Sequence, residues 1–306
     1  MKDMTKKSIN NFLLTNDLNI DLEDLKLIAN FVLEGDYADS TGLAMISDIK
    51  DFIRWYVKIN KEKFNFQRVT TRDIVDYKNH CIEESNHAAN TVNRKLATLR
   101  IFFKYLRTEG RIEKNPSDVV KNVARQPLAP RGLDRQQLRA LLKEVDIRGK
   151  LRDILIVEML SGAGFRVSEI ANLKIEDVSI REKSGYAIVK YGKGNKTRVV
   201  PLNNRIRTLL KEYIGDRPQS ENIFIGQRGA LTTIAFNKIL ELYADKVRLT
   251  CSPHRLRHTF SYNYLEKNPG DIIGLAQILG HSNINTTAIY TQNRIEDLQE
   301  KVEKMD

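Results

Sequence analysis

Two histidines, an arginine and a tyrosine gather in one short stretch near the end of the sequence. His254 and Arg257 stand three positions apart, so on a helix they share one face. His281 follows Gly280, a residue type that commonly ends helices, and Tyr290 comes nine positions later. An arginine beside an imidazole can hold a phosphate. The stretch therefore predicts that two histidines, an arginine and a tyrosine converge on one point, with a cradle for a phosphate.

Each of these residues has a plainer interpretation when it is considered alone. A single tyrosine is most often half-buried packing, and a single histidine is most often a hydrogen-bonded polar residue. His254 and His258 at i and i+4 can also bind zinc, but no glutamate follows His254 as it does in the HExxH zinc motif. We therefore expect no metal and no cofactor, and the prediction depends on the combination of residues.

Two further sequence motifs lie upstream of this stretch. One is Gly-Phe-Arg-Val-Ser-Glu, which places Arg166 at the start of a helix expected over 167–173. The other is Gly-Lys-Gly-Asn-Lys, which places Lys193 in a hairpin between strands expected over 186–191 and 197–202. A nucleotide-binding Walker loop is excluded because its G-x4-G-K-[ST] frame is missing and no helix follows.

These motifs together, in this order, resemble the active-site boxes of the tyrosine recombinases, the phage-integrase and Xer family. The carboxy-terminal signature is His-Arg-Leu-Arg-His-Thr-Phe, then Leu-Gly-His-Ser, then the tyrosine nine residues after that histidine. The resemblance is strong over 133–292 and weaker over 40–122. The six catalytic residues that it implies are Arg166, Lys193, His254, Arg257, His281 and Tyr290.

The resemblance implies a 3′-phosphotyrosyl intermediate formed without metal or ATP. A free tyrosine has a pKa near 10, so forming tyrosinate at pH 7 costs about 4 kcal/mol. His254 is the best candidate to receive the proton, with Arg166 and Arg257 supplying positive charge and clamping the phosphate oxygens. His281 can donate a further hydrogen bond, and Lys193 can protonate the departing 5′-hydroxyl.

Length and charge fit a two-part protein with a polyanionic partner. The chain has 306 residues, 41% of them hydrophobic, with a net charge of +11 and a pI near 9.5. Residues 1–49 carry 4 basic and 9 acidic side chains, residues 50–123 carry 16 and 9, and residues 124–306 carry 30 and 21. The acidic start is a poor phosphate contact, whereas both later blocks can face DNA.

Other sequence features predict the compartment. No apolar run approaches the ~18 residues that would span a membrane. The first seven residues lack the apolar core of a signal peptide. Cys81 and Cys251 are far apart in the sequence and are expected to be free thiols. We therefore expect a cytoplasmic protein with no membrane partner.

Apolar periodicity predicts a mainly α fold with a small antiparallel β-sheet. The first part combines helices expected from Asp21, over 40–60, from Thr71, from Asn90 and, briefly, from Asn115. The second part is expected to contain one helix that begins at Asp134, and further helices over 151–160, 167–173, 203–214 and 231–244. Three more are expected after these: one that begins at Pro253, one over 272–279, and a short one that carries Tyr290. The resemblance identifies these parts as a helical core-binding domain and a catalytic domain.

Basic side chains interleave with apolar ones on the helix expected from Asn90. The pattern fits either a solvated face or a helix laid along a DNA groove, and the resemblance favours DNA. The predicted DNA-binding residues are Arg94, Lys95, Arg100, Lys104, Arg125, Arg131, Lys196, Arg198 and Arg255.

The expected organisation has five parts. Residues 1–36 are an amino-terminal extension with one helix, 37–123 the core-binding domain, 124–132 an extended basic linker, 133–293 the catalytic domain, and 294–306 a helix for exchange between protomers. The resemblance implies a tetramer, or a pair with a second recombinase, acting on paired inverted-repeat sites in double-stranded DNA through a Holliday junction. Dimer resolution, integration or excision, and transposon resolution stay open as roles.

Three alternatives compete with a recombinase. A type IB topoisomerase would use the same chemistry without a partner strand. A DNA-binding regulator derived from a recombinase would have lost catalytic residues, and here all six types are present. A metal-dependent nuclease would need a carboxylate cluster, and none stands out in the sequence.

Overall fold

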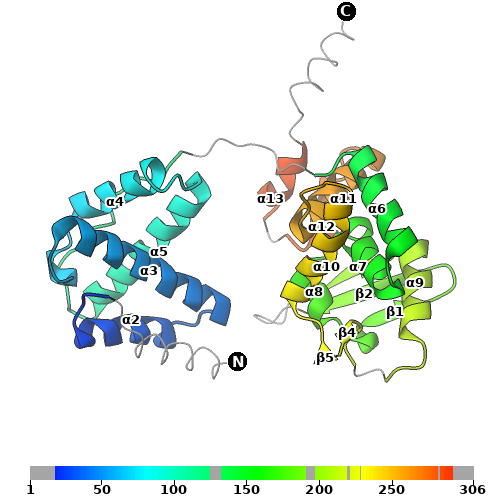
Figure 1. Cartoon of the computed structure of the whole chain (residues 1–306), viewed down its shortest axis with the longest axis horizontal. Coiled ribbons are helices and arrows are strands. Elements are labelled where there is room, and N and C mark those ends of the chain that lie inside the picture. Colours follow the sequence, from blue (N-terminus) through cyan, green and yellow to red (C-terminus); the bar gives the residue numbers. More distant parts are fainter. Residues whose placement is uncertain are drawn as a thin grey trace, which may run out of the picture. The chain divides into compact units, whose positions relative to one another are not determined.

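The structure is a computed structural model that describes residues 18–124, 132–190, 197–218, 221–227, 229–281 and 283–291. The chain divides into two compact units, Met1–Pro127 and Leu128–Asp306, and each is described by itself (Figure 1). Helices dominate both units and the sheets are small and antiparallel, so the predicted fold class is confirmed. Among the residues described, no helix is both long and apolar enough to cross a membrane.

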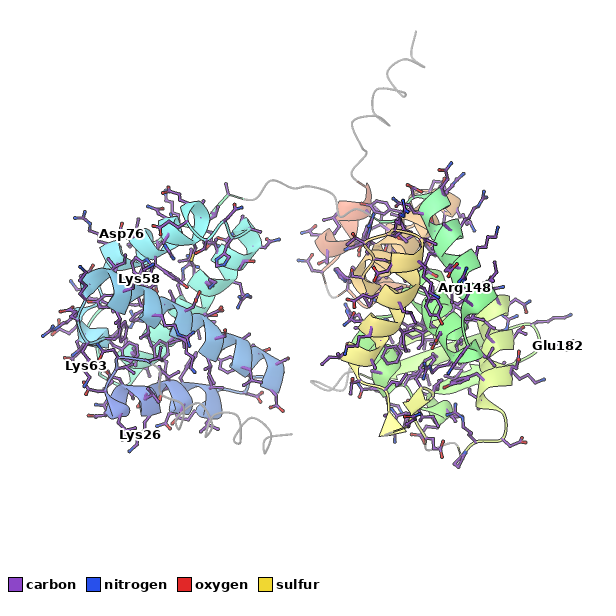
Figure 2. All side chains as sticks on the ribbon, in the orientation of Figure 1. Lys26, Lys58, Lys63, Asp76, Arg148 and Glu182 are labelled. Carbon is purple, nitrogen blue, oxygen red and sulfur yellow. The ribbon has the colours of Figure 1, made fainter. Side chains whose placement is uncertain are left out.

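The first unit is a helical bundle around an aromatic core. Its helices are α2 (Leu22–Glu34), α3 (Asp39–Asn60), α4 (Thr71–Glu83) and α5 (Ala89–Thr108), with a 3-10 turn at Phe66–Arg68. The ring of Phe52 on α3 lies within 6.3 Å of the rings of Tyr77 and Phe103. Charged side chains such as Lys58, Lys63 and Asp76 project from this unit (Figure 2). Aromatic burial therefore holds α3, α4 and α5 together.

Local hydrogen bonds explain why one helix predicted for the first unit is present and another is absent. Helix α4 begins where predicted, because Thr70 and Asp73 form a reciprocal capping box. The short helix predicted from Asn115 is wrong, since residues 116–119 form only a turn. The Asn115 side-chain oxygen accepts hydrogen bonds from the backbone nitrogen and the hydroxyl of Ser117. Such side-chain bonds compete with helix formation.

The second unit is built around one largely buried helix. Its helices are α6 (Arg135–Arg148), α7 (Leu151–Gly162), α8 (Val167–Asn172), α9 (Asn204–Ile214), α10 (Thr233–Lys246), α11 (Pro253–Lys267), α12 (Ile272–Leu279) and α13 (Asn285–Ala288). Short 3-10 turns cover Ile175–Asp177 and Ile289–Thr291. Helix α7 packs against α6, α9 and α11, and most of its side chains are buried. It therefore forms the centre of the unit.

A three-stranded sheet lies at one side of this unit, beside α12. Its strands are β1 (Val178–Ile180), β2 (Gly185–Lys190) and β3 (Thr197–Pro201), paired antiparallel in that order. Ala187 is the partner of both Val178 and Val200. A second, minimal pair joins β4 (Ile225–Gly226) to β5 (Gly229–Ala230). The predicted hairpin turn 192–196, with Lys193, the last residue of the strand predicted before it and the predicted final helix 294–306 lie outside the described residues.

The chain between α7 and α8 passes through one glycine with no room for a side chain. Gly164 has a φ of +67°, a left-handed conformation that favours glycine. A Cβ at this position would lie 2.4 Å from Cδ1 of Phe260 on α11. Backbone conformation and packing therefore both require glycine, immediately before the segment that carries Arg166.

We expect Gly164→Ala to destabilise the second unit by about 2–5 kcal/mol. The left-handed backbone costs roughly 1–2 kcal/mol and displacement of Phe260 about 1–3 kcal/mol more. The matched control is Gly270→Ala, where φ is +84° but no heavy atom lies within 4 Å of the added Cβ. Denaturant unfolding measures both. Equal losses in the two variants would show that Phe260 moves aside freely.

Candidate active site

Arg257 is the most deeply buried charged side chain at the site. It lies on α11 and is 1% exposed. Its Nη1 donates to the carbonyl of Gly164 at 2.6 Å, and its Nη2 donates to the carbonyl of Leu279 at 2.7 Å. Burial, and then the charge of Arg166, lowers its pKa to about 10, so it stays charged at neutral pH. The guanidinium therefore has a fixed orientation, because two other segments hold it.

His281 directly follows the left-handed cap of α12 at Gly280, as predicted. Nη2 of Arg257 lies 3.3 Å from Nε2 of His281, and Oγ1 of Thr287 lies 2.8 Å from Nδ1. An arginine can only donate, so Nε2 accepts and the proton of the neutral ring is on Nδ1, which donates to Thr287. Burial, followed by the charge of Arg257, lowers the pKa of His281 to about 4.

Arg166 belongs to a buried chain of charges. Glu169 accepts from Nη1 of Arg166 at 2.8 Å and from Nη1 and Nη2 of Arg198 at 2.6 and 2.8 Å. Burial alone would raise the pKa of the Glu169 carboxyl, but the two arginines outweigh it and hold the pKa below its usual range. Nε of Arg198 also donates to the carbonyl of Ile278 at 2.7 Å. This chain links α8, β3 and α12.

Tyr290 makes a contact that the sequence analysis did not predict. It lies on the 3-10 turn after α13 and is only 6% exposed. Its hydroxyl is 2.7 Å from Nδ1 of His258, not of His254. The sequence analysis considered His258 only as one half of a zinc pair. Its position four residues after His254, on the same face of a helix, is the signal that could have placed it at the site.

The histidines differ in their surroundings. His254 is exposed, whereas His258 is half-buried, and their rings meet edge to face with centroids 4.3 Å apart. Burial lowers the pKa of both, to about 4 for His258, with the charge of Arg257 acting in the same direction. Burial raises the pKa of Tyr290, while Ser261, Arg257 and Arg166 act against that rise. The resting pair is therefore a neutral phenol and a neutral imidazole.

The structure brings together five of the six predicted catalytic residues: Arg166, His254, Arg257, His281 and Tyr290. Lys193 lies outside the described residues. In the part of the chain that is described, no three His, Cys, Asp or Glu side chains are grouped so that they could hold a metal ion. The arrangement presents two arginines, three histidines and a tyrosine hydroxyl, which suits a phosphodiester.

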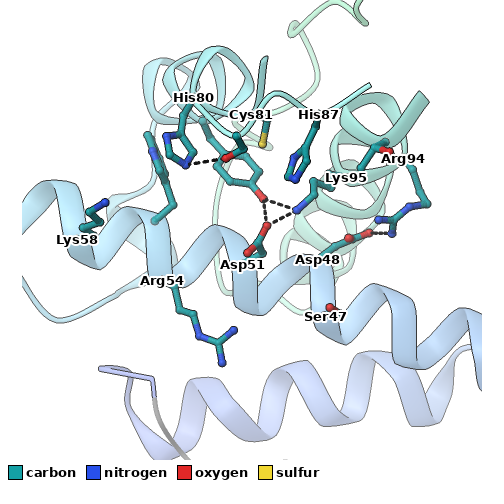
Figure 3. Close-up of a pocket in the computed structure, with 14 residues that line it drawn as sticks. Ser47, Asp48, Asp51, Arg54, Lys58, His80, Cys81, His87, Arg94 and Lys95 are labelled. Atoms are coloured by element: carbon teal, nitrogen blue, oxygen red, sulfur yellow. Dashed lines mark hydrogen bonds and ion pairs between the residues drawn. The ribbon is translucent and has the colours of Figure 1, made fainter. Parts of the chain in front are cut away.

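Predicted DNA-binding residues in the first unit line a polar hollow of about 570 Å³ (Figure 3). Arg94 is exposed and forms an ion pair with the buried carboxylate of Asp48. Lys95 is 6% exposed, and its amino group contacts Asp51 and Tyr77. The carboxylate of Asp51 already neutralises its charge, so Lys95 is a poor contact for a phosphate. Its described partners indicate that it holds α3 and α4 against α5.

The other predicted DNA-binding residues have different surroundings. Lys104 is exposed, and Arg100 is half-buried with its Nη2 donating to the carbonyl of Val120 at 2.6 Å. Arg255 is half-buried at the start of α11 and donates to the carbonyl of Thr250. Arg198 is 8% exposed within the buried charge chain. The residues that lie outside the described part are Arg125, Arg131 and Lys196.

Comparison with known proteins defines the class. Residues 131–296 match the phage integrase family, and residues 30–110 match the N-terminal SAM-like domain of phage integrases. The chain therefore belongs to the phage integrase family of tyrosine recombinases, enzymes of site-specific DNA recombination.

Relatives of the Xer type are similar along most of the chain. Tyrosine recombinase XerC of Listeria innocua is 31% identical over 281 residues, covering 87% of this chain and 91% of the relative. Tyrosine recombinase XerA of Pyrococcus horikoshii is 34% identical over 228 residues, covering 73% and 76%. The chain is thus an Xer-like tyrosine recombinase.

Solved structures share the fold. XerH recombinase bound to a palindromic difH substrate has a TM-score of 0.70 at 20% identity, covering 92% of this chain and 88% of that one. A lambda integrase dimer bound to a COC′ core site has a TM-score of 0.67 at 17% identity, covering 85% and 91%.

Acid should weaken the second unit through its half-buried histidines. The pKa of His258 and of His281 is about 4 in the folded state, against 6.5 when unperturbed. As the pH falls from about 6.5 towards 4, the unfolded chain takes up protons that the folded chain does not. We expect the thermal unfolding temperature to fall across this range, and less steeply in His281→Asn. A flat profile between pH 7 and 5 would contradict this.

Proposed function

We propose that this recombinase cleaves and rejoins DNA strands through a 3′-phosphotyrosyl intermediate on Tyr290. The observation that carries the proposal is the position of the Tyr290 hydroxyl: it is bound to a histidine of α11 and feels the charges of Arg257 and Arg166. A buried tyrosine in a group of cations is an unusual packing residue but a suitable nucleophile, because those charges stabilise tyrosinate.

The proposed reaction is an exchange of esters. The Tyr290 oxygen attacks the phosphorus as its proton passes to a base. The bond between phosphorus and the bridging 5′-oxygen breaks, and the 5′-oxygen leaves as a hydroxyl after taking up a proton. A 5′-hydroxyl from another strand then attacks the phosphotyrosine and releases the tyrosine. The ester bond is conserved throughout, so no ATP is required.

Arg257 and Arg166 are proposed to clamp the two non-bridging phosphate oxygens. Arg257 is rigidly placed by backbone carbonyls, and Arg166 is held by Glu169 with its side chain 37% exposed. Preorganised charges of this kind stabilise the transition state without reorganisation. We propose that they supply the positive charge in place of a metal ion.

His281 can contact the phosphate only after its present hydrogen bonds change. Its two ring nitrogens are occupied by Thr287 and Arg257. Donation to a phosphate oxygen therefore requires that His281 gives up its hydrogen bond with Nη2 of Arg257 and that the imidazole takes up a proton. A bound phosphate favours both changes because it brings negative charge. Lys193 is proposed as the proton donor to the 5′-oxygen, from the family resemblance alone.

We propose that residues 37–123 and 133–293 are the core-binding and catalytic domains, after an extension over 1–36 and joined by a linker over 124–132. The exposed or half-buried cations proposed to contact DNA are Arg94, Arg100, Lys104 and Arg255. A tetramer on paired inverted repeats is proposed, with residues 294–306 docking on a neighbouring protomer. The XerH neighbour is bound to a palindromic substrate and the lambda integrase neighbour is a dimer, which supports a two-fold site.

We expect Tyr290→Phe to bind DNA with nearly unchanged affinity and to lose covalent capture. The change removes one hydroxyl and no charge, so phosphate contacts stay intact. The measurement is a suicide-substrate assay in EDTA, using nicked duplexes with the inverted repeats found near the gene. An SDS-resistant adduct formed by the natural protein and absent in Tyr290→Phe is the expected result.

The control is Tyr264→Phe, on α11, where the hydroxyl donates to Asp271 at 2.6 Å and not to a reacting group. It should form the adduct at the natural rate. An adduct that persists in Tyr290→Phe would assign the nucleophile elsewhere, and one that requires added magnesium would reject the metal-free mechanism.

A further inference from the structure

The hydrogen bond between His258 and Tyr290 brings in a residue that is not among the six catalytic residues implied by the family resemblance. We propose that His258, rather than His254, is the base that takes the proton from Tyr290 when the tyrosine attacks DNA. This inference rests on the proposed function, since it concerns the same nucleophile. His258 is a catalytic residue in the strict sense, because it contacts the reacting oxygen.

The geometry supports proton transfer in the observed arrangement. Nδ1 of His258 lies 2.7 Å from the tyrosine oxygen, within the range needed of a general base. The two rings are tilted by 53°, and Tyr262 packs edge-on against the other side of the Tyr290 ring at 5.4 Å. The histidine and the tyrosine are therefore both held, the first by α11 and the second by the surrounding aromatic rings.

His254 is placed for a different task. It is exposed and lies one helical turn from His258, with its ring against the edge of the His258 ring. An exposed imidazole at this position can meet a phosphate oxygen or exchange a proton with water. A proton taken by Nδ1 of His258 returns to Tyr290 when the phosphotyrosine is resolved, so the full cycle consumes no proton.

The charges around His258 couple this step to DNA binding. The groups that face it are His254 and Arg257 on its own helix, His281 after α12, and Tyr290 itself. Burial, and then His254, Arg257 and His281, lower the pKa of His258, so without DNA it is a weak base. A phosphodiester held by the arginines adds negative charge nearby and raises the proton affinity of the imidazole. Substrate binding thereby strengthens the base.

The first test is His258→Asn, which keeps a hydrogen-bond acceptor near the position of Nδ1 but cannot take up a proton. We expect adduct formation in single-turnover assays to slow by about 10²–10³-fold at pH 7, with DNA affinity unchanged within about two-fold. The logarithm of its rate should rise by about one per pH unit from pH 6 to 9, as tyrosinate forms without help. The natural protein should be nearly flat over that range.

Changing the leaving atom of the DNA distinguishes a residue that acts as a base from one that acts as an acid. A duplex with sulfur in place of the bridging 5′-oxygen releases a thiolate that needs no proton. The defect of His258→Asn should persist on this duplex, whereas the defect of Lys193→Ala should disappear. Imidazole added to His258→Gly should restore part of the cleavage rate, which a loss of folding or packing would not allow.

Several outcomes would overturn the inference. His258→Asn could cleave at the natural rate with a flat pH profile, or the bridging sulfur could restore it. The cleavage rate of His254→Asn, and not that of His258→Asn, could show the steep rise with pH, which would make His254 the base. Failure of the natural protein to form any adduct on its cognate site would reject the proposed function itself, and is therefore distinguishable from failure of this inference.

Discussion

The burial of one positive charge constrains the whole active site. An isolated guanidinium is costly to remove from water, and Arg257 is tolerated at 1% exposure because backbone carbonyls accept its hydrogen bonds. Those carbonyls belong to Gly164 and Leu279, on segments that follow α7 and end α12. The arginine and the fold therefore depend on each other: if either segment moves, the charge is left buried without a partner, which costs roughly 3–5 kcal/mol in comparable cases.

A second buried charge connects the remaining parts of the site. Arg198 on β3 binds Glu169 and the carbonyl of Ile278, the residue before Leu279. Glu169 in turn holds Arg166. Arg257 and Arg166 are thus both positioned through neighbouring points on α12, and the link between them passes through the largely buried side chains of Glu169 and Arg198.

The sequence predicted the helices whose ends are fixed by hydrogen bonds between residues close together in the chain. Helices with capping residues, such as those after Asp134 and Asp271, begin where expected because the cap bonds involve residues three positions apart. The strand β1 was not predicted, since three residues are too short to show a period. Its pairing with β2 depends on the rest of the sheet, not on its own sequence.

What the sequence could not predict depends on distant partners. A lysine on an amphipathic helix is expected at the surface, yet Lys95 is buried against Asp51, which lies 44 positions away. Spacing placed His254 and His258 on one face of α11, but only the path of the chain to Tyr290, 32 positions later, decides which of them meets the hydroxyl. Long-range burial of charge leaves no periodic trace in the sequence.

The anchoring of Arg257 by carbonyls has a consequence for how this site can change over evolutionary time. Every residue type carries a backbone carbonyl, so substitution at the position of Leu279 leaves its hydrogen bond to the arginine available as long as the helix end is preserved. Only positions with a special backbone, such as Gly164, are tightly restricted. Such an anchor lets surrounding side chains drift without loss of geometry, which suits a fold shared with the XerH structure at 20% identity.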